Sequence, residues 1–501
     1  MGGVVMAELP LLSILVFLPL VGGLCLLPFG QQHRIARIIA IATALAELLI
    51  CVMLLLSVGS VTNAVPGLAL LLVEDYPWID RLGIRYTLGL DGISLLMVLL
   101  TSLITLMAML VSWRSIKDRV ALHYATILIM ETGIMGVFLS LDLVLFYLFW
   151  EVMLIPMFLL IGIWGHGRRI YSAVKFFLYT LAGSLLMLLA IIALYLIHGA
   201  QSGSYTFALP ALLQTRIEPT TAGWLFAAFL LAFAIKVPLF PVHTWLPDAH
   251  TDAPTAGSVI LAGLLLKTGA YGLIRFGFPL FPQAAKASAT LLFTLAIIGI
   301  IYGSWVAYAQ RDMKRLVAYS SVGHMGFVAL GIAAWTPLAL SGAILQMVNH
   351  GITTGALFAL VGMLDERTGT REIDAYGGLW GKIPMLSFFF LFFAMASAGL
   401  PGLNNFAGEF IILTGTFPIA PWAVAVGFFG VVLGLVYLVR LVQEVLFVRE
   451  RQALTLPDLS LREGALLTVL ALMALYLGVH PGPVLELVQA PVQLLTVGGG
   501  P

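Results

Sequence analysis

The sequence predicts an all-α protein that crosses a membrane many times. Of its 501 residues, 61% are hydrophobic and only 10% are charged, whereas about a quarter of the residues in an ordinary soluble domain are charged. Apolar stretches of about 20 residues, each long enough to cross the bilayer core, recur along the whole chain. Because lipid offers no hydrogen-bond partners to the backbone, each of these stretches is predicted to be a helix.

We place about fourteen membrane spans along the chain, with ends uncertain by a few residues. They lie near 9–29, 36–60, 92–113, 119–139, 141–163, 175–197, 223–247, 255–277, 287–308, 314–334, 338–364, 384–415, 421–447 and 462–480. Helices seven and twelve are predicted to be broken, because Pro238 and Pro241 interrupt one and Gly399-Leu400-Pro401-Gly402 interrupts the other.

The distribution of basic residues predicts the orientation of the chain. Most Lys and Arg residues fall in loops after odd-numbered spans, and the other loops hold only Arg81, Arg85, Arg216, Arg275 and Lys286. By the positive-inside rule, the odd-numbered loops are cytoplasmic and both termini are periplasmic. Lys236 and Lys267 are then the only basic residues left inside the spans.

The chain is expected to form a single membrane domain, 1–501, with an internal repeat. Glu151 and His324 are separated by 173 positions, and so are Lys236 and Glu409. Such matched groups five spans apart indicate two five-helix bundles in inverted orientation, although the local sequences match weakly and coincidence is the alternative. The parts would be N-terminal helices 1–3 (1–118), a first repeat (119–277), a second repeat (287–447) and a last helix (462–480). The outer loop near 61–90 is long enough to fold in part.

Ionisable side chains inside predicted spans are the strongest functional signal. A charge at the centre of a membrane helix costs about 2.5–3.5 kcal/mol and usually marks an ion or proton pathway. The set comprises Glu47, Glu131, Glu151, Lys236, Lys267, His324, His350 and Glu409. For any single member, a structural salt bridge or hydrogen bond is the alternative explanation.

A proton relay is the function that this set favours. Glu151 is the natural partner of Lys236, because an opposite charge keeps both groups ionised, and a change in their separation would alter proton binding at Lys236. His324 and His350 lie between Lys267 and Glu409 in chain order and suit proton transfer, since imidazole both accepts and donates a proton near neutral pH.

The remaining titratable residues are assigned lesser roles. His243 is a relay member or a local cap, and Glu131 is a relay member or a contact to a neighbouring subunit. Glu47 is expected to be peripheral. His166, His198, His250 and His480 are expected to be interfacial.

The sequence also excludes several functions. It contains no phosphate-binding loop, no cysteine cluster and no dinucleotide-binding motif, so no cofactor or metal site is expected in this chain. Its net charge of +1 suggests no nucleic-acid partner.

Four stretches resemble the antiporter-like subunits of respiratory complex I, which are related to the Mrp-type cation/proton antiporters. They are FYLFWEVMLIPMF, KVPLFPVHTWLPDAHTDAPTAGSVILAGLLLK, AQRDMKRLVAYSSVGHMGF and GLPGLNNFAGEF. The glutamate in the last stretch, Glu409, resembles the M-type subunits of bacterial NADH:quinone oxidoreductase, since most relatives have lysine there.

This resemblance implies a proton-translocating membrane-arm subunit in a bacterial inner membrane. Glu151 and Lys236 would be the paired charges, Lys267 the bridging lysine, His324 and His350 the central axis, and Glu409 the terminal residue. NADH, FMN, iron–sulfur clusters and quinone would be bound by other subunits, and L-type and N-type antiporter-like subunits would be neighbours. The alternatives are a sodium/proton antiporter subunit and a structural scaffold of the membrane arm.

Overall fold

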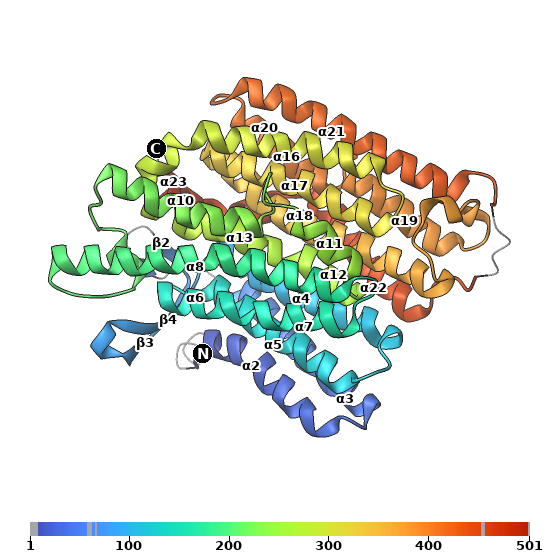
Figure 1. Ribbon diagram of the computed structural model, residues 1–501, viewed down its shortest axis with the longest axis horizontal. Coiled ribbons are helices and arrows are strands. Elements are labelled where there is room, and N and C mark those ends of the chain that lie inside the picture. Colours follow the sequence, from blue (N-terminus) through green and yellow to red (C-terminus); the bar gives the residue numbers. More distant parts are fainter. Residues whose placement is uncertain (1–8, 58–62, 66–67, 452–455, 499–501) are drawn as a thin grey trace.

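In the computed structural model, the chain forms a bundle of long helices whose axes are roughly aligned (Figure 1). The structure describes residues 9–57, 63–65, 68–451 and 456–498. The described residues form thirteen helical spans long and apolar enough to cross a membrane, with α6–α7 and α12–α14 each counted as one span. The other predicted span, 384–415, consists of two shorter helices, α19 and α20. The all-α, polytopic membrane fold predicted from the sequence is confirmed.

The N-terminal part contains membrane helices and small β-hairpins. Its elements are α2 (Leu11–Leu26), η1 (Leu27–Phe29), α3 (His33–Ser57), β1 (Asn63–Val65), β2 (Leu68–Leu70), β3 (Leu72–Ile79), η2 (Asp80–Leu82), β4 (Ile84–Leu90) and α4 (Gly92–Ser115). β1 pairs antiparallel with β2, and β3 pairs antiparallel with β4, with Leu72 opposite Leu90. The outer loop predicted near 61–90 therefore folds in part, as these hairpins.

The middle of the chain holds the helices that carry the two buried lysines. Its elements are α5 (Val120–Leu139), α6 (Leu143–Val152), α7 (Leu154–Trp164), α8 (Arg169–Ser202), α9 (Leu209–Leu212), α10 (Pro219–Lys236), α11 (Trp245–Asp252), α12 (Thr255–Ile260), η3 (Leu261–Leu265), α13 (Leu266–Gly272), η4 (Leu273–Gly277), α14 (Phe278–Leu280) and α15 (Pro282–Ala287).

The C-terminal part holds the helices that carry the two central histidines and Glu409. Its elements are α16 (Ala289–Ala309), α17 (Met313–Ala334), α18 (Pro337–Thr368), η5 (Ile373–Ala375), η6 (Leu379–Gly381), α19 (Pro384–Ser397), α20 (Asn404–Thr416), α21 (Pro421–Val442), η7 (Gln443–Phe447), α22 (Leu461–Val479) and α23 (Gly482–Gly498). The sequence analysis did not anticipate α23, which packs against α4, α18 and β2.

The spans differ greatly in how far other helices surround them. The most apolar window of α18, and that of the span from α12 to α14, is entirely buried, and α17 and α5 are nearly so. In α3, α21 and α22 only 33% of the window is buried. Ionisable groups on the enclosed spans can therefore find partners inside the protein instead of facing hydrocarbon.

Two predicted spans are interrupted where the sequence analysis expected continuous helix. Span five is divided into α6 and α7 at Met153, two residues after Glu151, because Pro156 has no N–H to bond back to Val152. Span eight contains two π-helical turns, η3 and η4, on either side of α13, which carries Lys267. Single π turns inside α-helices are frequently found at functional sites.

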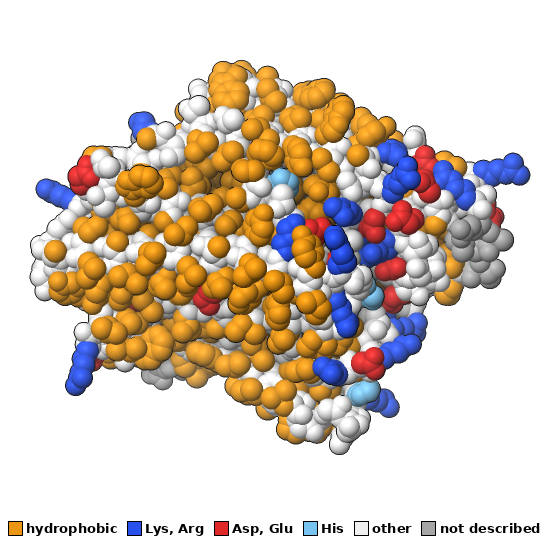
Figure 2. Space-filling model, in the orientation of Figure 1, with side chains coloured by type: hydrophobic (Ala, Val, Ile, Leu, Met, Phe, Trp, Pro, Cys, Tyr) orange, Lys and Arg blue, Asp and Glu red, His pale blue; other side chains and the backbone are white. Residues whose placement is uncertain are grey.

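Charged side chains gather at one end of the bundle, at the right in Figure 2, beyond a broad hydrophobic belt. Two basic residues that the sequence analysis assigned to loops are buried instead. Arg275 is 2% exposed within η4 and pairs with Asp91, and Lys314 is 4% exposed in the first turn of α17 and donates to the backbone oxygen of Ala253. Assigning basic residues to loops did not predict the burial of Arg275 and Lys314. A long basic side chain at a helix end can point into the protein and contact an acceptor there.

The Asp91–Arg275 pair joins the start of α4 to η4. Asp91 is the N-cap of α4, where its side chain accepts from the Ser94 backbone N–H at 2.9 Å and its own N–H donates to the Ser94 hydroxyl at 2.8 Å. Arg275 also donates through Nε to the Tyr271 hydroxyl at 3.1 Å. One carboxylate therefore satisfies a helix end and neutralises a buried guanidinium.

We expect Arg275→Met to destabilise the bundle strongly, because Asp91 would be left as an unpaired buried charge at a cost of about 3–5 kcal/mol. Assembly on a native gel and the temperature of irreversible inactivation would measure the effect. The double variant Asp91→Asn/Arg275→Met should recover most of the loss.

The matched control is Arg85→Met in the exposed β3–β4 hairpin. There the Arg85 guanidinium donates to Asp75 at 2.8 Å and lowers the pKa of that carboxyl. An exposed pair contributes only about 0.2–1 kcal/mol, so this variant should behave like wild type. Equal losses from Arg275→Met and Arg85→Met would contradict a special role for the buried pair.

Candidate functional site

Lys236 occupies the last turn of α10, immediately before the chain turns through 237–244 to α11. It is 1% exposed, and its ammonium lies 5.4 Å from the ring centre of Trp150 and 5.3 Å from that of Phe176. Two aromatic faces and the carbonyl end of a helix both favour a positive charge. Helix α13 approaches closely at Gly269, where a Cβ would fall 2.8 Å from that of Lys236.

Glu151 is near Lys236 but not in direct contact with it. The carboxylate acts on the lysine by its charge, yet no salt bridge within 4 Å joins them among the described residues. Glu151 is partly exposed on the side of the bundle, and its Oε1 is buried without a hydrogen-bond partner. The Trp150 ring and the Tyr147 hydroxyl lie beside these two charges.

Lys267 is completely buried in α13 and makes two polar contacts. It donates to the backbone oxygen of Ala262 in the π turn η3, and its Nζ lies 2.6 Å from Nδ1 of His350 on α18. The other ring nitrogen of His350 is buried without a partner. Because lysine is only a donor, Nδ1 of His350 acts as the acceptor when Lys267 is charged.

His324 on α17 links the centre of the bundle to Glu409 on α20. Its Nδ1 lies 2.8 Å from Oε1 of Glu409, and its Nε2 lies 3.0 Å from the Ser397 hydroxyl at the end of α19. Gln346 donates to the same Glu409 oxygen at 3.1 Å. The His324 and His350 ring centres are 5.7 Å apart. Lys267, His350, His324 and Glu409 therefore form one continuous line of ionisable groups.

Polar side chains of α18 form hydrogen bonds at the break between α19 and α20. Asn349 donates to the backbone oxygen of Asn404 at 2.7 Å, and Asn404 donates back to the Asn349 backbone oxygen at 3.1 Å. Thr353 donates to the Asn404 side-chain oxygen at 3.0 Å. Non-helical backbone at membrane depth requires such partners. These contacts fix the start of α20, and with it the position of Glu409.

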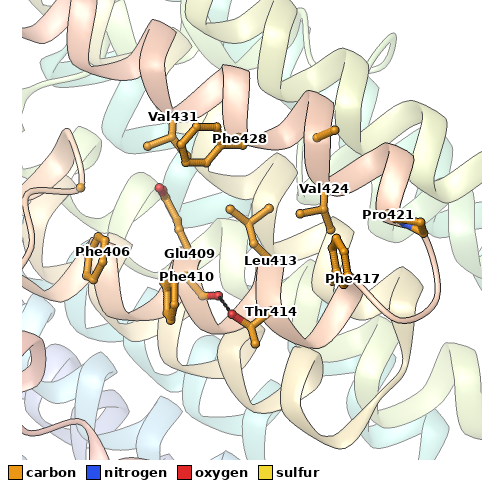
Figure 3. Close-up of a pocket in the computed structure, with 12 residues that line it drawn as sticks. Phe406, Glu409, Phe410, Leu413, Thr414, Phe417, Pro421, Val424, Phe428 and Val431 are labelled. Atoms are coloured by element: carbon orange, nitrogen blue, oxygen red, sulfur yellow. Dashed lines mark hydrogen bonds between the residues drawn. The ribbon is translucent and has the colours of Figure 1, made fainter.

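Glu409 is also the one ionisable group, among the described residues, that lines an apolar groove of about 650 Å³ between α20 and α21. Figure 3 shows its carboxyl pointing toward Phe428 and Val431 of α21, with Phe406 and Phe410 beside it. A small polar cavity of about 10 Å³ lies on the other side of the carboxyl. Its polar lining residues are Ser304, Ser320, His324, Ser397, Glu409 and Tyr437.

Other titratable residues lie off this line. His243 stacks on Phe240 and contacts Tyr302 edge to face, and its Nδ1 has no partner. Glu47 and Glu131 lie together on α3 and α5. The described residues contain no group of three or more His, Cys, Asp or Glu side chains placed to hold a metal ion.

His250 was expected to be interfacial, and this expectation is wrong. It is fully buried on α11, its ring stacks on Phe358 with centres 4.4 Å apart, and neither ring nitrogen has a partner. The charges of Lys314 and Lys267 both act on it. The available signal was its position seven residues after His243, which places both near one face if the helical turns continue.

The sequence matches the family described as "NADH:quinone oxidoreductase/Mrp antiporter, TM" over residues 140–434. It is 47% identical to NADH-quinone oxidoreductase subunit M of Pseudomonas aeruginosa over 82% of each chain. It is 43% identical to the subunit M of Escherichia coli K12 over 95% of this chain and 96% of that protein.

Comparison with solved structures also finds subunits of such membrane complexes. The fold is similar to a chain of respiratory complex I from Thermus thermophilus, with a TM-score of 0.86, 34% identity and coverage of 97% of this chain and 99% of that one. It is also similar to a chain of the Mrp complex from Dietzia, with a TM-score of 0.84, 21% identity and coverage of 97% and 98%. The two curated relatives described above are M subunits, and the chain belongs to the family of NADH:quinone oxidoreductase/Mrp antiporter membrane subunits.

Proposed function

We propose that this chain is a proton-translocating membrane-arm subunit of a bacterial NADH:quinone oxidoreductase. The observation that carries the proposal is the buried line from Lys267 through His350 and His324 to Glu409. Its members are one amine, two imidazoles and one carboxyl group, each able to bind and release a proton. The names of the curated relatives support the assignment to this enzyme.

Lys236 and Glu151 would form the loading end of the relay. Because they are close but not in contact, their attraction can strengthen or weaken with a small movement. When Glu151 approaches, the protonated form of Lys236 is favoured, and when Glu151 withdraws, the lysine in its apolar surroundings tends to lose its proton. The break in the chain after α10 supplies a place for such movement.

The proton would then pass to Lys267 and along the histidines. His350 accepts at Nδ1 from Lys267, and rotation of its ring or one bridging water would carry a proton across the 5.7 Å between the ring centres to His324. His324 is already bonded to Glu409. The Ser397 hydroxyl, bonded to the other ring nitrogen, would hold the His324 ring in place.

His250 and Lys314 supply a candidate route from the aqueous phase. Lys314 lies in the first turn of α17, and His250 interacts electrostatically with both Lys314 and Lys267. We infer that protons reach Lys267 from this side, which is cytoplasmic if the positive-inside assignment holds.

The energy involved is modest. Moving one charge against about 100 mV requires about 2.3 kcal/mol, which corresponds to a change of about two pKa units in one carrier. A neighbouring subunit that displaces Glu151 could supply this free energy. The redox chemistry that drives the displacement would take place in other subunits. In this proposal NADH, FMN, iron–sulfur clusters and quinone are bound by other subunits.

The same proposal places the chain in the bacterial inner membrane with both termini periplasmic, between L-type and N-type antiporter-like neighbours. It retains the two inverted five-helix repeats, 119–277 and 287–447. The rival function, a sodium/proton antiporter subunit, has less support, because the match to the Mrp complex is 21% identical and bears on the fold alone.

Lys236→Ala tests the loading end. If Lys236 is the first carrier, the assembled variant should lose both NADH-driven proton pumping in proteoliposomes and coupled NADH oxidation, by about 100-fold or more. Native gels would establish assembly. Normal pumping by an assembled variant would make Lys236 structural, and sodium-dependent pumping without NADH would favour the antiporter.

His350→Leu tests the middle of the line. Leucine fills similar space but offers no nitrogen, so Lys267 would lose its acceptor and pumping should fall at least about tenfold. His243→Leu is a matched control, since that ring has no hydrogen-bonded link to the line. Equal losses in the two variants would contradict the path through His350.

Glu409→Gln tests the terminal residue. Glutamine can still accept from Gln346 but cannot exchange a proton, so assembly should persist while pumping falls at least about tenfold. Glu409→Asp should retain part of the activity in the same proteoliposome assay. If the glutamine variant pumped like wild type, the carboxyl of Glu409 would serve packing alone.

A further inference from the structure

Two glutamates of the N-terminal helices lie together inside the membrane, away from the line described above. Glu47 on α3 is fully buried and Glu131 on α5 is 1% exposed. The two carboxyl groups interact with each other, and the Thr105 hydroxyl of α4 lies beside Glu131. The three helices α3, α4 and α5 pack against one another, so the two carboxyl groups share one enclosed site.

The one potential donor beside the two glutamates is the Thr105 hydroxyl, which lies next to Glu131. All four carboxyl oxygens are buried without a hydrogen-bond partner when both groups are counted as acceptors. An ionised carboxylate only accepts hydrogen bonds, whereas a protonated one also donates. A single proton on either group therefore creates the bond that the two ionised groups cannot make.

Among the described residues, no cation acts on either carboxyl of the pair. The nearest basic residue on α3 is Arg37, ten residues or about 15 Å along the helix from Glu47, and it donates to the Ile116 backbone oxygen. On α5, His123 is two helical turns from Glu131 and bonds the Ser112 hydroxyl. The most apolar parts of α2 and α4 carry no charged residue, and the other titratable group at the site is the Cys51 thiol.

The pair lies one helix away from the central line. Thr105 of α4 adjoins Glu131, and the preceding residue, Ile104, packs against Gly263 in the π turn next to Lys267. Leu100 of α4 packs against Gly351, the neighbour of His350. Helix α4 thus has the acid pair on one side and the line on the other, at similar depth, and its apolar side chains separate them.

We propose that Glu47 and Glu131 form a proton-binding site that holds at least one proton at neutral pH, as a carboxylic acid hydrogen-bonded to its partner. Two ionised carboxylates in this enclosure would repel each other, and one neighbouring hydroxyl without a cation would not offset that cost. Binding of the proton forms one O–H bond on a carboxylate oxygen and breaks no covalent bond in the protein. The inference is independent of the proposed function, because it concerns the resting protein and not turnover.

Infrared difference spectroscopy of the assembled complex at pH 8 tests the site. The spectrum of wild type minus Glu47→Gln/Glu131→Gln should contain a carboxylic acid C=O band that shifts in D2O. Ordinary carboxyls, with pKa values of about 4, are fully ionised at this pH. Glutamine supplies an amide donor, so the variant should assemble, and the single variants serve if the double variant does not.

Glu218→Gln is the matched control. Glu218 is an exposed N-cap whose carboxyl accepts from two backbone N–H groups, and its difference spectrum should contain carboxylate bands alone. If the double variant also gives only carboxylate bands, both groups are ionised and the proposal is wrong. Carboxylate bands that respond to added sodium would overturn it in favour of a cation site. NADH-driven pumping is not needed for any of these outcomes.

Discussion

The cost of an ionised group in a bilayer is the constraint on which the rest of this structure depends. The line from Lys267 to Glu409 runs through α13, α18, α17 and α20, and three of these belong to spans that are almost wholly enclosed by protein. Helices such as α3, α21 and α22 are largely uncovered on the outside of the bundle, where lipid or a neighbouring subunit can contact them. The arrangement lets each member of the line be the hydrogen-bond partner of another, so that few groups outside the line are needed to satisfy it.

Interrupted helices are the second consequence of this constraint. A regular helix consumes its own carbonyls and amides, whereas the π turn before Lys267 presents the Ala262 oxygen and the end of α10 places a carbonyl terminus at Lys236. The gap between α19 and α20 brings Ser397 to one face of His324 and Glu409 to the other. At η3 and at the start of α20, side chains satisfy the polar backbone that enters the membrane.

Much of this was predictable, because charges inside apolar stretches are conspicuous in a sequence. Five of the six residues expected to form the relay are buried, and Glu151 is partly exposed. Lys267, His350, His324 and Glu409 lie side by side in that order, with the two histidines in the reverse of their chain order. The contacts were harder to predict, because distances between helices depend on how their side chains pack. Glu151 makes no salt bridge with Lys236, and the His250 ring is buried against Phe358. The equal spacing of 173 residues was a weak guide to geometry, because Lys236 precedes its break whereas Glu409 follows its own.

The two ends of the proposed relay, Lys236 and Glu409, lie in different surroundings, and this difference affects whether the chain can transfer protons without its neighbours. Lys236 is enclosed by aromatic rings, and Glu409 adjoins a groove whose other lining residues are almost all apolar. A proton leaving Glu409 toward α21 would meet hydrocarbon if lipid filled that groove, and transfer would stop there. Polar groups from an adjacent subunit, or water admitted by movement of α21, would have to complete the path. Proton transfer through this chain is therefore expected to depend on its neighbours at the Glu409 end as much as on displacement of Glu151 at the other.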